Sequence, residues 1–315
     1  MLGVSHQPVP DRCVACGSAG LRPHLRVAGE AGPQGLIPTT DSFGTALSDI
    51  VRCPACGHMQ LERFPASEEL EGAVSEAASE DYIEEETGQR ATARRVLAEI
   101  ERFAAPGPIV DLGCWTGFLL AEARDRGWQP LGIEPSEFAS EFARQRLGLD
   151  VRTDSLEHAD LPAAHFRAAV MGDVIEHLLD PAGALARVAR VLGPGGVICL
   201  MLPDAGSRLA RGMRARWWSV IPTHIQYFTR ASVGTLLERC GYRVLRVTTQ
   251  PKAFTVRYYL GRVGGYWPPL ASALVRGAEG IGLAERLWAP DFRDRMLVIA
   301  RPGGDAPAGS PSPLR

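Results

Sequence analysis

Two pairs of cysteines with identical spacing stand near the start of the chain. Cys13 and Cys16 form one C-x-x-C-G motif, and Cys53 and Cys56 form a second after a gap of 36 residues. Four thiolates suit the closed tetrahedral coordination of a structural zinc ion. A pair of redox C-x-x-C sites is the alternative, but neither motif lies in a β-α-β context. The spacing therefore predicts a structural Zn2+ site.

A glycine-containing turn lies between an expected strand and an expected helix. It includes Gly113 and Gly117, and the next expected strand ends at Glu134. Such a turn lets backbone N–H groups approach a ligand closely, and a carboxylate at the neighbouring strand end can accept both hydroxyls of a ribose. The combination indicates a loop that binds a nucleoside rather than a tight turn with a structural role alone. NAD enzymes share it, so this pair alone does not identify the cofactor.

Two histidines, His177 and His224, are expected near the carboxyl ends of strands, where a substrate would bind. An unperturbed imidazole has a proton affinity that suits a general base at neutral pH. Each histidine also has a structural alternative. His224 would cap or orient a helix that begins near Thr229, and His177 would pack beneath the cofactor.

A basic and aromatic segment follows the fifth expected strand. It carries four arginines: Arg208, Arg211, Arg214 and Arg216. Guanidinium groups bind phosphate or carboxylate bidentately, so a phosphate-bearing acceptor is one expectation. A solvated helical face is the second. Peripheral contact with anionic lipid is the third, because Trp217 and Trp218 adjoin the arginines and residues 256–288 are apolar and aromatic.

Composition limits the classes of partner. The 315 residues carry 34 Lys and Arg against 36 Asp and Glu, a net charge of −2, so the chain lacks the basic excess that attracts nucleic acid. No apolar run reaches the length of a membrane span, and the first residues do not resemble a signal peptide. A cytoplasmic protein is therefore expected, and its oligomeric state is left open.

Short apolar runs alternate with amphipathic helices after residue 107, which predicts a doubly wound, mostly parallel Rossmann-like α/β sheet of about seven strands. The expected strands are 109–112, 130–133, 168–171, 196–202, 242–248 and 296–300. The expected helices are 118–126, 137–147, 181–191 and 231–240.

The chain divides into four expected segments. A zinc-ribbon-like module at 10–62 is followed by a linker and lead-in helix at 63–106. The catalytic domain is expected at 107–301, with a helical insertion at 254–290, and a disordered tail at 302–315.

Over nearly all of residues 107–301 the chain resembles class I S-adenosylmethionine (SAM)-dependent methyltransferases. DLGCWTG at 111–117 resembles that family's D-x-G-x-G-x-G motif, DVIEH at 173–177 its fourth motif, and LGPGG at 192–196 its L-x-P-G-G turn. Trp115 departs from the pattern, because a middle glycine is usual there and a bulky ring would crowd the methionine end of SAM unless it turns away. The resemblance implies these cofactor-binding residues: Asp111, Gly113, Cys114, Trp115, Gly117, Glu134, Pro135, Asp154, Ser155 and Asp173.

Two further resemblances concern the acceptor. HIQYFT at 224–229 resembles the H-x-x-Y/F-F-T signature of a small-molecule branch, and the four-cysteine module is similar to that of sugar C-methyltransferases. They imply methyl transfer to a small polar acceptor such as a sugar, nucleotide sugar or natural-product intermediate, with oxygen as the expected atom. An RNA methyltransferase that uses the zinc module for binding, and a non-catalytic SAM-binding protein, are the alternatives.

Overall fold

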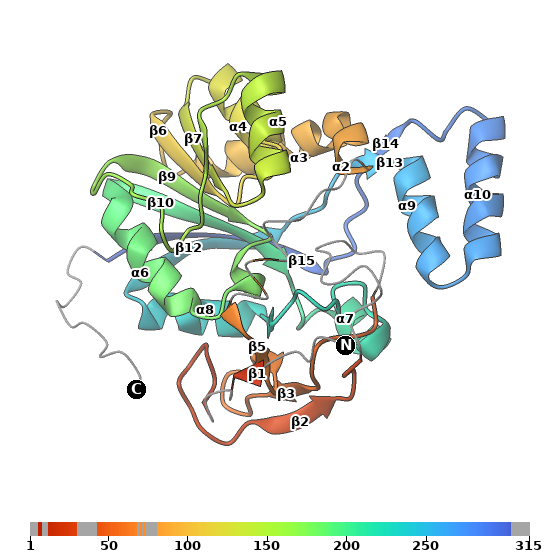
Figure 1. Ribbon diagram of the computed structural model, residues 1–315, viewed down its shortest axis with the longest axis horizontal. Helices are drawn as coiled ribbons and strands as arrows, with labels where there is room; N and C mark the ends of the chain where they lie inside the picture. The colour runs from red at the N-terminus through yellow and green to blue at the C-terminus, as the bar shows by residue number, and fades with distance from the viewer. Residues whose placement is uncertain are drawn as a thin grey trace.

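The computed structural model describes residues 6–7, 12–29, 43–67, 70, 72 and 81–303. Its centre is a seven-stranded sheet in the order β12-β15-β10-β9-β6-β7-β8, in which β15 is antiparallel to both neighbours (Figure 1). This arrangement confirms the predicted doubly wound α/β fold. The strands are β6 (Pro108–Leu112), β7 (Gln129–Glu134), β8 (Val151–Thr153), β9 (Phe166–Gly172), β10 (Leu192–Pro203), β12 (Tyr242–Thr249) and β15 (Arg295–Pro302).

Helices cover both faces of this sheet because its strands are apolar on both sides. In β6, Ile109 packs in the cluster that contains α3, whereas Val110 packs in the cluster that contains α6 and α8. Side chains alternate between faces along a strand, so one buried strand serves both layers. The helices are α3 (Glu86–Ile100), α4 (Phe118–Asp125), α5 (Glu137–Leu147), α6 (Pro181–Val191) and α8 (Arg230–Arg239).

Side-chain caps fix where three of these helices begin. Ser136 accepts the N–H of Ala139 before α5, and Asp180 accepts the N–H of Gly183 before α6. Thr229 caps α8 in a reciprocal capping box with Ser232. Such caps satisfy N–H groups that have no partner within the helix. The first turns of these helices are therefore set locally by the sequence.

The elements differ from the sequence prediction in two places. The short edge strand β8 was not expected, because its three residues are too few to show a hydrophobic period. Strand β10 begins at Leu192, before the expected start at 196, because Leu192 pairs with Phe166 ahead of a register shift.

The N-terminal segment forms a sheet together with β11, which belongs to the larger α/β part of the chain. The strands β2 (Arg22–Leu25), β3 (Ile50–Arg52) and β4 (Met59–Leu61) are antiparallel, and β11 (Gln226–Tyr227) pairs with β4 to give the order β11-β4-β3-β2. Gln226 Oε1 accepts the N–H of His58 Nε2 at 3.0 Å, and Gln226 Nε2 donates to the Leu178 carbonyl at 3.3 Å. The two parts of the chain are thus joined by a strand pair and by buried polar contacts.

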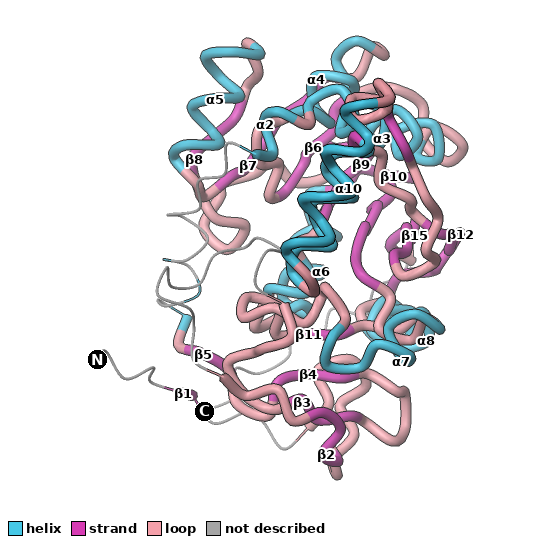
Figure 2. Tube along the Cα trace, turned by 90° about the vertical axis from the view of Figure 1, so that its right-hand side faces the viewer, coloured by secondary structure: helices cyan, strands magenta, loops and turns pink. Residues whose placement is uncertain are grey.

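A helical segment projects from the C-terminal part of the sheet (Figures 1 and 2). Strands β13 (Phe254–Thr255) and β14 (Leu287–Trp288) pair where it leaves and rejoins the sheet. Between them lie α9 (Val256–Arg262), a single 3₁₀ turn and α10 (Pro268–Gly280). No helix in the described ranges is long and apolar enough to cross a bilayer.

The smaller remaining elements are β1 (His6–Gln7), β5 (Phe64–Pro65), α2 (Asp81–Glu84) and α7 (Arg208–Met213). The expected tail begins at residue 302, but Pro302 still belongs to β15. The remainder of that tail, 304–315, lies outside the described residues.

We predict that Gln226→Ala lowers the free energy of unfolding by about 1–3 kcal/mol, because it leaves buried polar partners on His58 and Leu178 unsatisfied. Chemical denaturation of the full chain measures the change. Gln129→Ala is the matched control, since Gln129 is exposed on β7. Equal stability of the two variants would contradict the role assigned to Gln226.

Candidate cofactor and acceptor site

A cavity of about 320 Å³ lies at the carboxyl ends of β6, β7, β9 and β10. Ligands bind at this edge of open α/β sheets because the strand-to-helix loops converge there. The structure brings these sequence-predicted residues into its wall: Asp111, Gly113, Cys114, Trp115, Glu134, Asp173, His177 and His224. The predicted residues Gly117, Pro135, Asp154 and Ser155 are not among those that line it.

The glycine loop needs its glycines for two reasons. Gly113 has φ +79°, and a Cβ there would lie 2.5 Å from Val174 Cγ2. Gly117 has φ +80° and a Cβ would lie 2.7 Å from Leu149 Cδ1, so it serves the turn into α4 rather than the cavity. A left-handed backbone and a close approach both exclude larger residues. The loop is thus shaped to bring its backbone close to the cavity.

Trp115 also has a left-handed backbone, with φ +49°. Its ring is half-buried in the wall of the cavity, and its indole Nε1 is buried without a hydrogen-bond partner in the described part of the chain. An indole N–H is a donor only, so it is available to an acceptor atom of a bound molecule. The conformation explains why glycine is usual at this position of the motif.

Glu134 ends β7 and holds the glycine loop. Its Oε2 accepts the Trp115 N–H at 2.8 Å and its Oε1 accepts the Ser136 N–H at 2.9 Å. Burial raises the pKa of Glu134, although both N–H donors act in the opposite direction. Burial and the neighbouring Glu134 also raise the pKa of Asp111, to about 7. A carboxylate has about four acceptor positions, so Glu134 can still accept from a ribose.

Asp173 faces two cations that the sequence reading missed. Lys252 Nζ donates to Asp173 Oδ2 at 2.6 Å, and the Arg295 guanidinium pairs with Oδ1. Burial alone would raise the pKa of Asp173, but Arg295 and Lys252 hold it far below its usual range. Both cations line the cavity. Neither lies in a recognisable motif, so only the sheet topology reveals them.

His177 and His224 lie together, with ring centroids 4.7 Å apart. His177 Nδ1 donates to the Thr223 carbonyl and His224 Nδ1 to the Ser219 carbonyl, each at 2.8 Å. A carbonyl only accepts, so Nδ1 carries the proton and Nε2 keeps a free lone pair. Burial lowers the pKa of both imidazoles, and the proximity of His177 lowers that of His224 further. Both rings are therefore neutral at pH 7.

Glu176 lies beside the two histidines and is almost fully buried. Neither of its carboxyl oxygens has a hydrogen-bond partner among the described residues. Burial, and then the charge of Asp173, raises its pKa to about 8. The potential ligand atoms of Glu176, His177 and His224 lie within 4.8 Å of one another, so this trio could hold a divalent cation.

The four predicted cysteines also converge. The Sγ atoms of Cys13 and Cys56 are 3.6 Å apart, as are those of Cys16 and Cys53. All four sulfurs lie within 4.8 Å of one another. A tetrahedral ion with Zn–S bonds of about 2.3 Å requires sulfurs about 3.8 Å apart. The cluster thus has the size of a single four-thiolate metal site.

Two tryptophans of the basic segment have different positions. Trp217 is buried, and its indole N–H donates to Asp294 Oδ2 at 3.3 Å. Trp218 lines the cavity. Neither is placed as an exposed lipid anchor; the exposed aromatic residues lie in and beside the helical segment, where Trp267 and Trp288 are the largest.

Comparison with known proteins agrees with this geometry. A family described as a methyltransferase domain matches residues 85–247, which is more than half of the chain. A ubiquinone biosynthesis O-methyltransferase of Hahella chejuensis is 33% identical over 30% of this chain and 43% of its own length. A protein of Mycolicibacterium smegmatis, named as a probable S-adenosylmethionine-dependent methyltransferase, is 29% identical over 43% of this chain and 52% of its own length.

The chain thus spans about half the length, or less, of these curated relatives. Among solved structures, a chain of the complex that contains the Haloferax volcanii Trm112 methyltransferase activator superposes with a TM-score of 0.51. It covers 70% of this chain and 92% of its own length at 16% identity, a likeness that shows the fold alone.

We predict that Glu134→Ala weakens SAM binding by well over tenfold, because it removes the carboxylate that we expect to accept the ribose hydroxyls and that holds the Trp115 N–H. Isothermal titration calorimetry measures the affinity, and circular dichroism verifies that the variant is folded. Glu137→Ala, an exposed change in the first turn of α5, is the control. Unchanged affinity in a folded Glu134→Ala protein would refute the assignment.

Proposed function

The chain belongs to this methyltransferase-domain family of class I SAM-dependent enzymes, and from that premise we propose that it methylates an oxygen atom of a small polar acceptor. The observation that carries the proposal is the pair of neutral histidines, each with a free Nε2, in the cavity that contains Glu134. The relatives named as O-methyltransferases favour oxygen as the methylated atom.

The residues present fit an adenosyl cofactor. Gly113 places the loop backbone in the cavity wall, Glu134 has further acceptor capacity, and the Trp115 indole N–H lacks a partner in the described ranges. When bound, SAM supplies a methyl group on a sulfonium, which a nucleophile attacks in line. The protein must therefore hold an acceptor oxygen in line and receive its proton.

His224 is our candidate for the group that receives the proton. Its Nδ1 is fixed on Ser219, so its Nε2 is the acceptor atom, and its lowered pKa keeps that atom unprotonated at neutral pH. It takes no part in the cap of α8, which Thr229 provides. His177 has the same hydrogen-bond arrangement and lies against His224, so it is the alternative base.

We also propose that the four cysteines hold one structural zinc ion. Four thiolates fill a tetrahedral site and leave no open position for a substrate. Arg239 of α8 donates to the carbonyls of Val14 and Ala15 within the first C-x-x-C-G motif. The expected role of the metal is thus to stabilise a unit that packs on the catalytic part of the chain.

We predict that the purified protein carries about one equivalent of zinc and that Cys53→Ser lowers both the zinc content and the melting temperature, since metal binding is coupled to folding. Elemental analysis and thermal denaturation measure the two effects. Cys240→Ser changes a thiol outside the cluster and serves as the control. Metal-free protein of full stability would eliminate the site.

For the base, His224→Ala should lower kcat by about 10²- to 10⁴-fold with little change in SAM affinity. The acidic limb of the wild-type pH–rate profile should have its midpoint below 6.5, because a base with a lowered pKa stays unprotonated to a lower pH. That limb should disappear in the variant. His165→Ala, at an exposed histidine, is the control.

If His224→Ala keeps a kcat close to that of the wild type, either His177 receives the proton or the reaction depends on positioning of the acceptor alone. His177→Ala in the same assay then separates these outcomes, since the acidic limb would disappear in this variant only if His177 were the base.

A further inference from the structure

A second cavity, of about 650 Å³, opens beside α7, at the start of α8 and at the loop before β15. Its charged lining consists of Arg208, Arg211, Arg230, Arg293, Asp204 and Asp291. Four guanidinium groups therefore face two carboxylates. A concave surface with an excess of positive charge attracts anions, provided that the carboxylates do not neutralise it.

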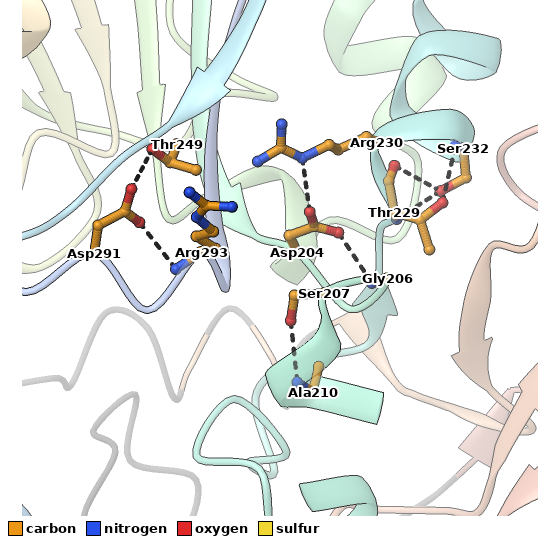
Figure 3. Close-up of polar contacts among 10 residues, drawn as sticks. All are labelled: Asp204, Gly206, Ser207, Ala210, Thr229, Arg230, Ser232, Thr249, Asp291 and Arg293. Carbon is orange, nitrogen blue, oxygen red and sulfur yellow. Dashed lines mark hydrogen bonds and ion pairs between the residues drawn. The ribbon is translucent and has the colours of Figure 1, made fainter. Parts of the chain in front are cut away.

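The first carboxylate is engaged by the fold itself. Asp204 is buried, its Oδ1 accepts the Gly206 N–H at 3.0 Å, and its Oδ2 accepts Arg230 Nε at 2.9 Å (Figure 3). This contact orients Arg230 through one of its donors only. Its two terminal nitrogens make no hydrogen bond or ion pair with any residue that the structure describes. Arg230 is therefore held in place with most of its donor capacity free.

The second carboxylate fixes a loop. Asp291 accepts the Thr249 hydroxyl at 2.7 Å and the Arg293 N–H at 2.9 Å, as Figure 3 shows. Arg293 has φ +57°, a left-handed conformation that is unfavourable for a residue with a side chain. Asp291 thus stabilises a strained backbone that places Arg293 at the cavity. Strain of this kind persists where the surrounding structure requires a particular side-chain position.

The remaining two arginines lie three residues apart on α7 and therefore share a helix face. Neither Arg208 nor Arg211 has an ion pair or a side-chain hydrogen bond within the described ranges. Arg214 and Arg216, which the sequence groups with them, do not line the cavity. Two of the four arginines of the basic segment thus line the cavity, and Arg230 and Arg293 from other segments complete its set of four.

An aromatic contact links the walls of the two cavities. Phe292 lines the second cavity and Trp218 lines the first, and their rings meet edge to face with centroids 5.7 Å apart. The strand that follows carries Arg295 into the first cavity. A molecule that reached past this aromatic pair would occupy both cavities at once.

We propose that the arginine-lined cavity binds a phosphate or diphosphate group. Guanidinium groups match phosphate oxygens bidentately, and those of Arg208, Arg211 and Arg293 are not neutralised by any described carboxylate. The group belongs either to the methyl acceptor, whose other end enters the first cavity, or to a separate phosphorylated ligand. Only the first of these sources rests on the proposed function.

The first test is a calorimetric titration of the full chain with inorganic pyrophosphate at low ionic strength. Wild-type protein should bind it, and Arg211→Gln should weaken binding by about tenfold or more, as expected for the loss of charged hydrogen bonds. Arg216→Gln, in the same segment but outside the cavity, should change the affinity less than threefold. Arg208→Gln provides a second cavity variant if Arg211→Gln does not fold.

No binding of pyrophosphate by the wild type, or equal losses in Arg211→Gln and Arg216→Gln, would overturn the proposal. SAM affinity is measured on the same samples and should be unchanged in all of them. Pyrophosphate binding without SAM binding would contradict the proposed function but not this site. SAM binding without pyrophosphate binding would contradict this site alone.

The second test identifies the source of the phosphate. A small-molecule extract is incubated with the protein and methyl-labelled SAM, with or without prior phosphatase treatment of the extract. Loss of labelled product after phosphatase treatment assigns the phosphate to the acceptor. Unchanged labelling, together with pyrophosphate binding that depends on Arg211, assigns it to a separate ligand.

Discussion

Four carboxyl groups meet at one edge of the sheet, and the site depends on how the fold accommodates them. Glu134 is held by two backbone N–H groups, and Asp173 by Lys252 and Arg295. Among the residues that the structure describes, Asp111 and Glu176 have no such partners, and burial raises their pKa values instead. Parallel strands bring these acids together from distant parts of the sequence, and buried charges must be paired or neutralised. The C-terminal strand is therefore part of the site, because it supplies Arg295.

The four-cysteine unit is connected to the same site through β11. Its strand β4 pairs with Gln226 and Tyr227, and His224 lies two residues before that pair. His58, at the end of the second C-x-x-C-G motif, contacts Gln226 within the protein interior. His224, which lines the first cavity, is thus positioned between the sheet of the cysteine unit and the Ser219 carbonyl. This path connects the four-cysteine unit physically to the wall of the first cavity.

The sequence predicted the features that local rules determine. The glycine loop at Gly113 belongs to a short motif, so this loop, most strands and helices of the α/β domain and eight of the residues that line the first cavity could be predicted. The partners of Asp173 could not, because 79 residues separate it from Lys252 and 122 from Arg295. For the second cavity the sequence indicated Arg208 and Arg211 but not Arg230 and Arg293, because these arginines come from three separate segments that only the tertiary fold brings together.

Trp115 shows how a departure from a motif can be compatible with its function. A non-glycine residue in the left-handed region costs about 1–2 kcal/mol, and the Trp115 N–H bond to buried Glu134 offsets part of that cost. Glu134, at the end of the neighbouring strand β7, thus stabilises the backbone conformation that a glycine at position 115 would adopt freely. Compared with a glycine at this position, Trp115 adds an aromatic ring to the cavity wall and a buried indole N–H that has no partner in the described ranges. We therefore expect Trp115 to change which atoms of a bound molecule the loop contacts, while the loop keeps its approach to the cavity.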